Sequence, residues 1–121
     1  MAGVQALDFD SPDETRTPAK TRVDVVRTDG GATAARLTLE PGWKWSECVK
    51  PAVGTDRCQV HHVGFIQSGR MHVVHEDGTE LELEPGSAYE ILPGHDAWVV
   101  GDDRCVAFEF ESRAAEEYAR R

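Results

Sequence analysis

The chain has 121 residues, the length of one domain that can bury about two-thirds of its unfolded surface. Its 22 acidic and 13 basic residues give a formal net charge of -9, which repels nucleic acids and anionic membranes, so neither is an expected partner. No apolar run approaches the roughly 18 residues of a membrane helix, and the first residues lack the basic and apolar regions of a signal peptide, which predicts a cytoplasmic protein. Cys48, Cys58 and Cys105 are odd in number and lack framework spacing, so we expect reduced thiols.

The chain begins with a polar arm. Residues 1–20 contain Pro12 and Pro18 and show no sustained hydrophobic period, so we predict an extended segment. This arm could be loose, could lie along the folded domain or could add to the sheet of a partner. Two strands are predicted next, at 22–28 and 32–39, because Asp29-Gly30-Gly31 between them is typical of a hairpin turn.

An aromatic segment follows the break at Pro41-Gly42. Trp43 and Trp45 are two residues apart, so on a strand they would share one face. They would then either cover the core or form one wall of a ligand pocket, and the core is the commoner place for aromatic side chains.

The second half of the chain is predicted to consist of short strands separated by turns. Asp77-Gly78 between two alternating runs is a hairpin signal, because glycine supplies the positive φ of the turn. Residues 112–121 are rich in alanine and glutamate and follow a suitable N-cap, Ser112, so we predict a short C-terminal helix. The predicted strands of this half span 70–75, 79–84, 87–92, 96–100 and 104–111. About eight short strands at such spacings are typical of an all-β sandwich or barrel.

Two stretches carry a family resemblance. The first runs from Cys58 to Gly69 and reads Cys-Gln-Val-His-His-Val-Gly-Phe-Ile-Gln-Ser-Gly. The second runs from Glu84 to His95 and reads Glu-Pro-Gly-Ser-Ala-Tyr-Glu-Ile-Leu-Pro-Gly-His. Together they resemble the paired motifs of the cupin superfamily, and the resemblance covers roughly residues 20–111, most closely to small single-domain bacterial cupins.

The spacing of the motifs is kept, whereas the ligand types differ. Counting back from the last glycine of the first motif, His62 occupies the position of the family's glutamate. Cys58 and Asp56 occupy the positions of its two histidines. In the second motif Ala97 stands at the family's histidine, and His95 lies two residues earlier.

The resemblance implies one domain at residues 21–111, a small double-stranded β-helix, or jelly-roll barrel, of the cupin type. The arm at 1–20 would precede this barrel and the helix at 112–121 would follow it. Cupins of this size commonly pair through a sheet, so the resemblance also implies a homodimer. A pocket is expected at the open end of the barrel, lined by the candidate ligands together with Trp43, Trp45, Met71 and Trp98.

Cys58 and His62 are the central candidates for a metal site. On a straight strand about 13 Å would separate them, at roughly 3.3 Å per residue, so shared ligation requires a bend. The first cupin motif spans two strands joined by a corner, which would bring Cys58, His62 and Asp56 together, with His95 reaching in from a neighbouring strand. Sulfur and nitrogen donors favour Zn, Fe or Cu over Mg or Ca. A divalent transition metal is therefore the candidate cofactor, and no organic cofactor is predicted.

Each candidate ligand also has a purely structural interpretation. Cys58 could be a small buried apolar residue, as free cysteines usually are. His62 could be a hydrogen-bonded interior histidine, and Asp56 could cap the turn that begins at Gly54. His95, directly after Pro-Gly, could be an exposed turn residue at the barrel mouth.

Two functions from different classes fit this sequence. The first is a barrel that binds or senses a small ligand without catalysis, and the departures at Asp56, Cys58 and Ala97 favour it. The alternative is a metal-dependent enzyme of the oxygenase, isomerase or lyase type acting on a small molecule. In that case the ion would act as Lewis acid or oxygen activator, and His95 would move protons.

Overall fold

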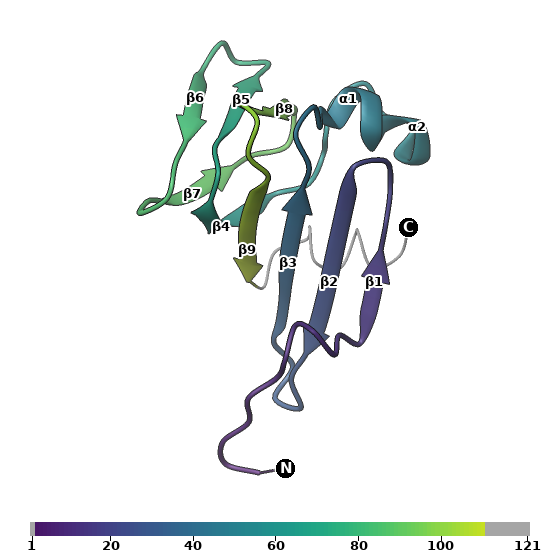
Figure 1. Ribbon diagram of the computed structural model, residues 1–121, viewed down its shortest axis with the longest axis vertical. Coiled ribbons are helices and arrows are strands. Elements are labelled where there is room, and N and C mark those ends of the chain that lie inside the picture. Colours follow the sequence, from purple (N-terminus) through teal and green to yellow (C-terminus); the bar gives the residue numbers. More distant parts are fainter. Residues whose placement is uncertain (1, 111–121) are drawn as a thin grey trace.

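The computed structural model describes residues 2–110, in which the chain forms nine strands and two short helices (Figure 1). The strands are β1 (Glu14–Arg16), β2 (Thr21–Arg27), β3 (Thr33–Leu39), β4 (His62–Ser68), β5 (Met71–His75), β6 (Glu80–Leu83), β7 (Ala88–Ile91), β8 (His95–Val99) and β9 (Cys105–Phe110). The helices are α1 (Trp45–Cys48) and α2 (Lys50–Val53). The predicted C-terminal helix at 112–121 lies outside the described residues. No helix in the described part of the chain is long and apolar enough to cross a membrane.

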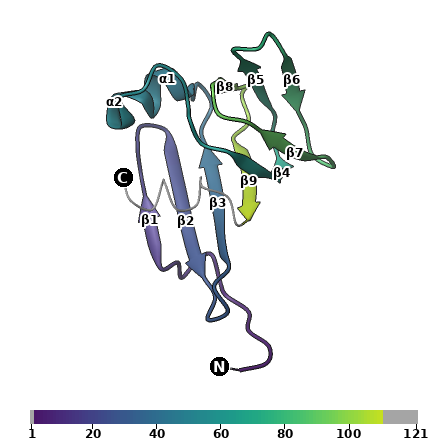
Figure 2. The same cartoon turned by 180° about the vertical axis from the view of Figure 1, so that it is seen from behind.

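The strands form two antiparallel sheets. One has six strands in the order β1-β2-β3-β9-β4-β7, and the other has three in the order β6-β5-β8. Figure 1 and its reverse view, Figure 2, place the smaller sheet beside β4 and β7, while β1 and β2 form the far edge of the larger sheet. The all-β prediction is therefore confirmed, and the core lies where the two sheets face each other.

Side chains alternate between core and outer face along the strands that enclose this core. The burial of β9 follows Cys105, Ala107 and Glu109, and that of β4 follows His62, Gly64 and Ile66. Successive side chains of a strand point to opposite faces, so each strand presents one row of residues to the core. Glu109, only 1% exposed, is an acid within an otherwise apolar row.

Both predicted hairpins are present. β2 and β3 pair from Arg27 with Thr33 to Thr21 with Leu39, around a turn in which Gly31 has a φ of 93°. β5 and β6 are joined by a turn in which Gly78 has a φ of 95°. These positive φ values are the conformations that favour glycine in tight turns.

The segment after Pro41-Gly42 differs from the prediction. Trp43 precedes α1 and Trp45 begins it, so the two rings do not share the face of a strand, although both are buried. Pro51 lies in the first turn of α2, where the missing N–H of proline is tolerated. Gly54, with a φ of 81°, ends α2 as a left-handed cap.

Part of the predicted arm joins the larger sheet. β1 pairs antiparallel with β2, and Asp13 N donates to the Val25 carbonyl oxygen over 2.8 Å. This part of the arm is therefore neither loose nor added to a partner, but lies along the chain's own folded domain. Phe9, further upstream, packs edge-on against Phe108 at a centroid distance of 5.2 Å.

Candidate metal centre

Three buried side chains converge between the two sheets: Cys58, His62 and His95. Each offers one ligand atom, and these atoms all lie within 4.8 Å of one another. The thiol sulfur of Cys58 lies 3.6 Å from Nε2 of His62. The rings of His62 and His95 meet edge to face, with centroids 4.9 Å apart.

A crossover of the chain from one sheet to the other brings Cys58 and His62 together. Cys58 belongs with the smaller sheet, because its N–H donates to the His95 carbonyl oxygen over 2.8 Å. His62 begins β4 in the larger sheet, where it lies opposite Ile91 of β7. The chain therefore bends between residues 58 and 62, as the sequence analysis required for shared ligation.

A buried carboxylate fixes the orientation of His62. Nδ1 of His62 lies 2.8 and 3.0 Å from the two carboxylate oxygens of Glu109. The hydroxyl of Tyr89 donates to the same carboxylate over 2.7 Å. Because a carboxylate accepts, Nδ1 carries the hydrogen and Nε2 is turned toward Cys58. Gly64 makes room for this arrangement, since a Cβ there would overlap the Phe108 carbonyl oxygen and approach Cγ of Glu109 at 2.9 Å.

His95 is oriented by its own turn. Its Nδ1 lies 2.8 Å from the Leu92 carbonyl oxygen, which can only accept, so Nδ1 carries the hydrogen. Nε2 of His95 is then the ring nitrogen left for the centre. This is the pattern of metal-binding histidines, in which one nitrogen donates to a carbonyl or carboxylate while the other coordinates.

The electrostatics of the centre favour a thiolate beside an imidazolium. Burial opposes ionisation of Cys58, but hydrogen bonds from His62 and His95 outweigh it and lower the pKa of Cys58 to about 6. Burial also opposes a charge on His62, but Glu109 and then Cys58 raise the pKa of His62 to about 10. Cys105 shows what burial does alone, because it raises the pKa of that thiol to about 11. The histidines are therefore the reason that Cys58 ionises.

The donor set fits a transition metal ion. Ligand atoms about 2.3 Å (sulfur) and about 2.0–2.1 Å (nitrogen) from a tetrahedral zinc ion lie about 3.6 Å apart. The separation between Cys58 Sγ and His62 Nε2 is 3.6 Å. One thiolate and two imidazoles are soft to intermediate donors, which suit Zn, Fe or Cu and not Mg or Ca.

A small cavity of about 20 Å³ adjoins the two histidines. Its lining includes Trp43, Trp45 and Met71, three of the predicted pocket residues, together with the carboxylate-bearing Glu109. A water molecule requires about 10–15 Å³, so the cavity alone has room for about one small ligand, and a larger molecule would have to extend beyond it.

Solved structures supply the fold comparison, since no protein-family model and no curated protein matches the sequence. The chain is similar to a cupin-like protein from Thermotoga maritima, with a TM-score of 0.54 and 14% identity over 81% of this chain and 76% of that one. It is also similar to the polyketide cyclase RemF from Streptomyces resistomycificus, with a TM-score of 0.61 and 16% identity over 90% and 79% of the two chains. For KdgF from Halomonas sp. the TM-score is 0.60, with 19% identity over 88% and 93%.

The chain has a cupin-type fold. This confirms the fold that the paired motifs around Gly69 and Gly94 implied, with two facing antiparallel sheets forming the double-stranded β-helix.

Two predicted site residues lie away from the centre of this cupin fold. Asp56 is fully exposed and pairs with Lys50 over 3.6 Å, because it lies in the loop after α2, before the chain turns inward. Trp98 lies on the outer face of β8, since His95 and Ala97 take the inward positions. Its ring stacks on His72, with centroids 4.9 Å apart.

Glu109 and Tyr89 were missed by the sequence analysis. The alternation of the last predicted strand could have revealed Glu109, because Glu109 falls on the same face of that strand as Cys105 and Ala107. An acid on the inward face of a strand requires a buried partner. That partner, His62, is 47 residues away in sequence.

The thiolate–imidazolium pair predicts a pH dependence of stability in the metal-free protein. The pKa of Cys58 falls from 9.0 to about 6, so its contribution is complete above pH 9 and is lost as the pH falls through about 6. The pKa of His62 rises from 6.5 to about 10, so its contribution is complete below pH 6.5 and is lost as the pH rises through about 10. We expect a plateau between about pH 6.5 and 9, with losses on both sides.

Urea unfolding in the presence of a chelator at a series of pH values measures this profile. Cys58→Ser removes the group that titrates near pH 6, so the variant should lose less stability than the wild type on acidification. Parallel wild-type and variant curves between about pH 6 and 9 would show that Cys58 is not a thiolate at neutral pH.

Proposed function

We propose that Cys58, His62 and His95 bind one divalent transition metal ion, and that the protein binds or senses a small ligand at this ion. The observation that carries the proposal is the convergence of three buried ligand atoms within 4.8 Å beside a cavity of about 20 Å³. Zinc sites with three protein ligands keep a fourth position for water or an exogenous ligand, whereas structural sites use four protein ligands.

The side chains around the ion have separate tasks in this proposal. Cys58 supplies negative charge as a thiolate, and the two histidines supply neutral nitrogens. Glu109 holds the Nδ1 hydrogen of His62 and so keeps Nε2 directed at the ion. Trp43, Trp45 and Met71 exclude bulk water from the cavity. The bound ion would supply a Lewis-acidic position at which a small donor ligand is held.

Substitution with Co²⁺ tests this function, because its visible spectrum reports thiolate ligation and coordination number. We expect the metal-free protein to take up one Co²⁺ per chain and to develop a thiolate charge-transfer band. Azide or cyanide should then change the spectrum saturably by entering the open position. A spectrum without thiolate character would contradict the proposed ligand set, and a spectrum insensitive to both anions would contradict the open position.

A metal-dependent enzyme is the second candidate function. It is favoured by Glu109, whose carboxylate lines the same cavity as the two histidines and is placed to accept a proton there. The similarity of the chain to the polyketide cyclase RemF agrees with this candidate at the level of fold. Incubation of the metal-loaded protein with a bound small molecule separates the two, because unchanged recovery supports binding and more than one product per chain supports catalysis.

We further propose a cytoplasmic homodimer. The three free cysteines suit a reducing compartment. The outer face of β4 and β9 exposes three large apolar side chains, Val63 (44%), Phe65 (40%) and Phe110 (47%). The ring of Phe65 stacks on Phe110 with centroids 6.2 Å apart, so these residues form one continuous patch that a second copy can cover.

Light scattering on a size-exclusion column measures the oligomeric state. We expect a dimer for the wild type and a monomer for Phe65→Glu, because a buried unpaired carboxylate opposes association. Leu81→Glu, an equally polar change at an exposed residue of the other sheet, is the control and should remain dimeric. A monomeric wild type, or a dimeric Phe65→Glu variant, would contradict this interface.

A further inference from the structure

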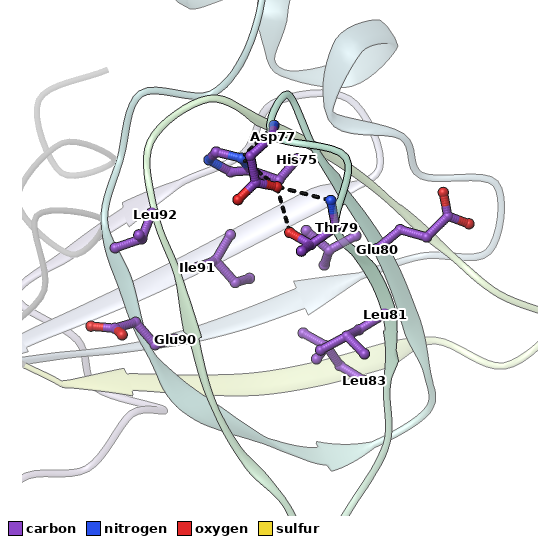
Figure 3. A pocket seen from close by; sticks show the side chains of 10 residues that line it. His75, Asp77, Thr79, Glu80, Leu81, Leu83, Glu90, Ile91 and Leu92 are labelled. Atoms are coloured by element: carbon purple, nitrogen blue, oxygen red, sulfur yellow. Dashed lines mark hydrogen bonds and ion pairs between the residues drawn. The ribbon is translucent and has the colours of Figure 1, made fainter.

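A second cavity opens where the free edges of the two sheets meet (Figure 3). It has a volume of about 210 Å³ and lies between β6 and β7, the edge strands of the smaller and the larger sheet. Figure 3 shows Leu92 and Glu90 on one side, Leu81 and Leu83 on the other, and Ile91 between them. None of the three proposed metal ligands lines this opening.

The opening exposes side chains that belong to the inner face of the barrel. Leu81 lies opposite Val73 in the β5–β6 ladder, and directly opposed residues of a ladder share a face. Val73 is 7% exposed, whereas Leu81 is 67% exposed. Leu92, the residue after β7, also lines the opening and is 53% exposed, although it does not share the inward parity of Tyr89 and Ile91. Apolar side chains on the inner face of a barrel meet solvent here because β6 and β7 do not pair with each other.

The rim of the opening is acidic. Asp77, Glu80 and Glu90 line it with His75, and no lysine or arginine is among the lining residues that the structure describes. Each carboxylate has a histidine beside it, with His75 3.1 Å from Asp77, His72 3.1 Å from Glu80 and His61 2.8 Å from Glu90. The carboxylate of Asp77 is held in place by the N–H and hydroxyl of Thr79, over 2.8 and 2.6 Å. The same two contacts lower the pKa of Asp77, which keeps the carboxylate ionised. In Figure 3 the carboxylates of Glu80 and Glu90 point away from the opening on opposite sides, whereas Asp77 lies at one end of it. A fixed carboxylate beside an apolar floor makes an environment for a cation that carries a hydrocarbon body.

Ile91 connects this opening with the metal centre. Its side chain lines both the 210 Å³ opening and the 20 Å³ cavity beside His62 and His95. It lies directly opposite His62 in the β4–β7 ladder. One side chain therefore separates a molecule in the opening from the proposed ion.

We propose that the opening between β6 and β7 binds a small organic cation, an amine on an aliphatic or aromatic body. The body lies against Leu81, Leu83 and Ile91, and the ammonium group lies beside the carboxylate of Asp77. The volume of about 210 Å³ is below the roughly 300–1,000 Å³ of sites for drug-sized ligands, which limits the body to a single ring or a short chain. The further step, that this ligand lies beside the metal ion, rests on the proposed function.

Phenethylammonium is a suitable probe, and phenylacetate is its anionic counterpart of similar size. Methyl and amide NMR spectra of the labelled protein locate binding residue by residue, in the metal-free and in the zinc-loaded protein. We expect phenethylammonium to shift the signals of Leu81, Leu83, Ile91 and Leu92 saturably, and phenylacetate to bind about tenfold more weakly or not at all. Equal binding of the two compounds, or shifts elsewhere in the protein, would overturn the proposal.

Two variants separate the apolar from the charged contribution. Leu81→Trp replaces an exposed isobutyl side chain with a larger indole ring across the opening and should abolish the shifts. Asp77→Asn, whose amide oxygen can still accept from Thr79, should weaken binding about two- to fivefold, the range for one exposed ion pair. Glu47→Gln, an exposed glutamate of α1 outside the opening, should leave binding unchanged. An Asp77→Asn variant that binds like the wild type would overturn the role of this carboxylate.

A paramagnetic ion tests the link to the metal centre. With Co²⁺ in the centre, the protons of bound phenethylammonium should relax faster than with Zn²⁺. Binding without this difference would overturn the link. Failure to take up any metal would overturn the proposed function while leaving the binding test in metal-free protein intact, so the two failures are distinguishable.

Discussion

Cys58→Ser is expected to abolish stoichiometric metal binding while the protein remains folded. The thiolate is the only anionic ligand of the three that converge, and a serine hydroxyl stays protonated at neutral pH. Loss of a partner that merely orients a ligand costs about 10–100-fold in affinity, so loss of the thiolate itself should cost more. His62 keeps its ion pair with Glu109 at 2.8 Å in the variant, and no buried charge is left without a partner.

Elemental analysis after gel filtration, on protein purified without a histidine tag, measures this effect. Cys48→Ser is the matched control, because Cys48 is also a free thiol but lies outside the group of three. We expect one ion per chain in the wild type and in Cys48→Ser, and none in Cys58→Ser with an unchanged circular dichroism spectrum. Equal metal content in Cys58→Ser and wild type would show that the ion is held elsewhere.

The fold was accessible from the sequence because its signals are local. Asp29-Gly30-Gly31 and Asp77-Gly78 specify hairpins through backbone conformations that glycine favours, and both hairpins are present. Alternation of apolar residues then predicts which face of each strand is buried. The helices after Pro41-Gly42 escaped this reasoning, because each has four residues, too few for a helical period to appear.

The site was accessible only in part, because it depends on contacts between distant strands. Cys58 and His62 were identified from spacing within one motif, and His95 from its place at the end of the second. Asp56 met the same spacing rule, but its loop directs the side chain to solvent. Glu109 belongs to no motif, and its role depends on β9 lying beside β4 in the larger sheet. The spacing of residues within a motif does not show which distant strand will pair with β4.

Glu109→Ala is expected to destabilise the protein by about 3–5 kcal/mol, the cost of removing one partner from a buried ion pair. The carboxylate is 2% exposed and lies 2.8 Å from His62, which would be left charged and buried, or would have to lose its proton. The Tyr89 hydroxyl would also lose an acceptor. Urea unfolding at pH 7 measures the change. Glu90→Ala is the matched control, because its Glu–His pair with His61 has the same 2.8 Å separation but is largely exposed. Glu90→Ala should lower the free energy of unfolding by only about 0–1 kcal/mol.

Glu109→Gln separates the charge of this carboxylate from its shape. The amide oxygen can still accept the Nδ1 hydrogen of His62, so the ring keeps its orientation, while the pKa of His62 should fall because Glu109 is the main cause of its rise. The alkaline loss of stability should accordingly move to lower pH, and metal affinity should fall about 10–100-fold, as for other partners that orient a ligand. If Glu109 served only to fill the core, Glu109→Gln would leave both the pH profile and the metal affinity unchanged. A shift in both would mean that one buried carboxylate, far from either motif, governs the charge state and the orientation of the histidine at the centre.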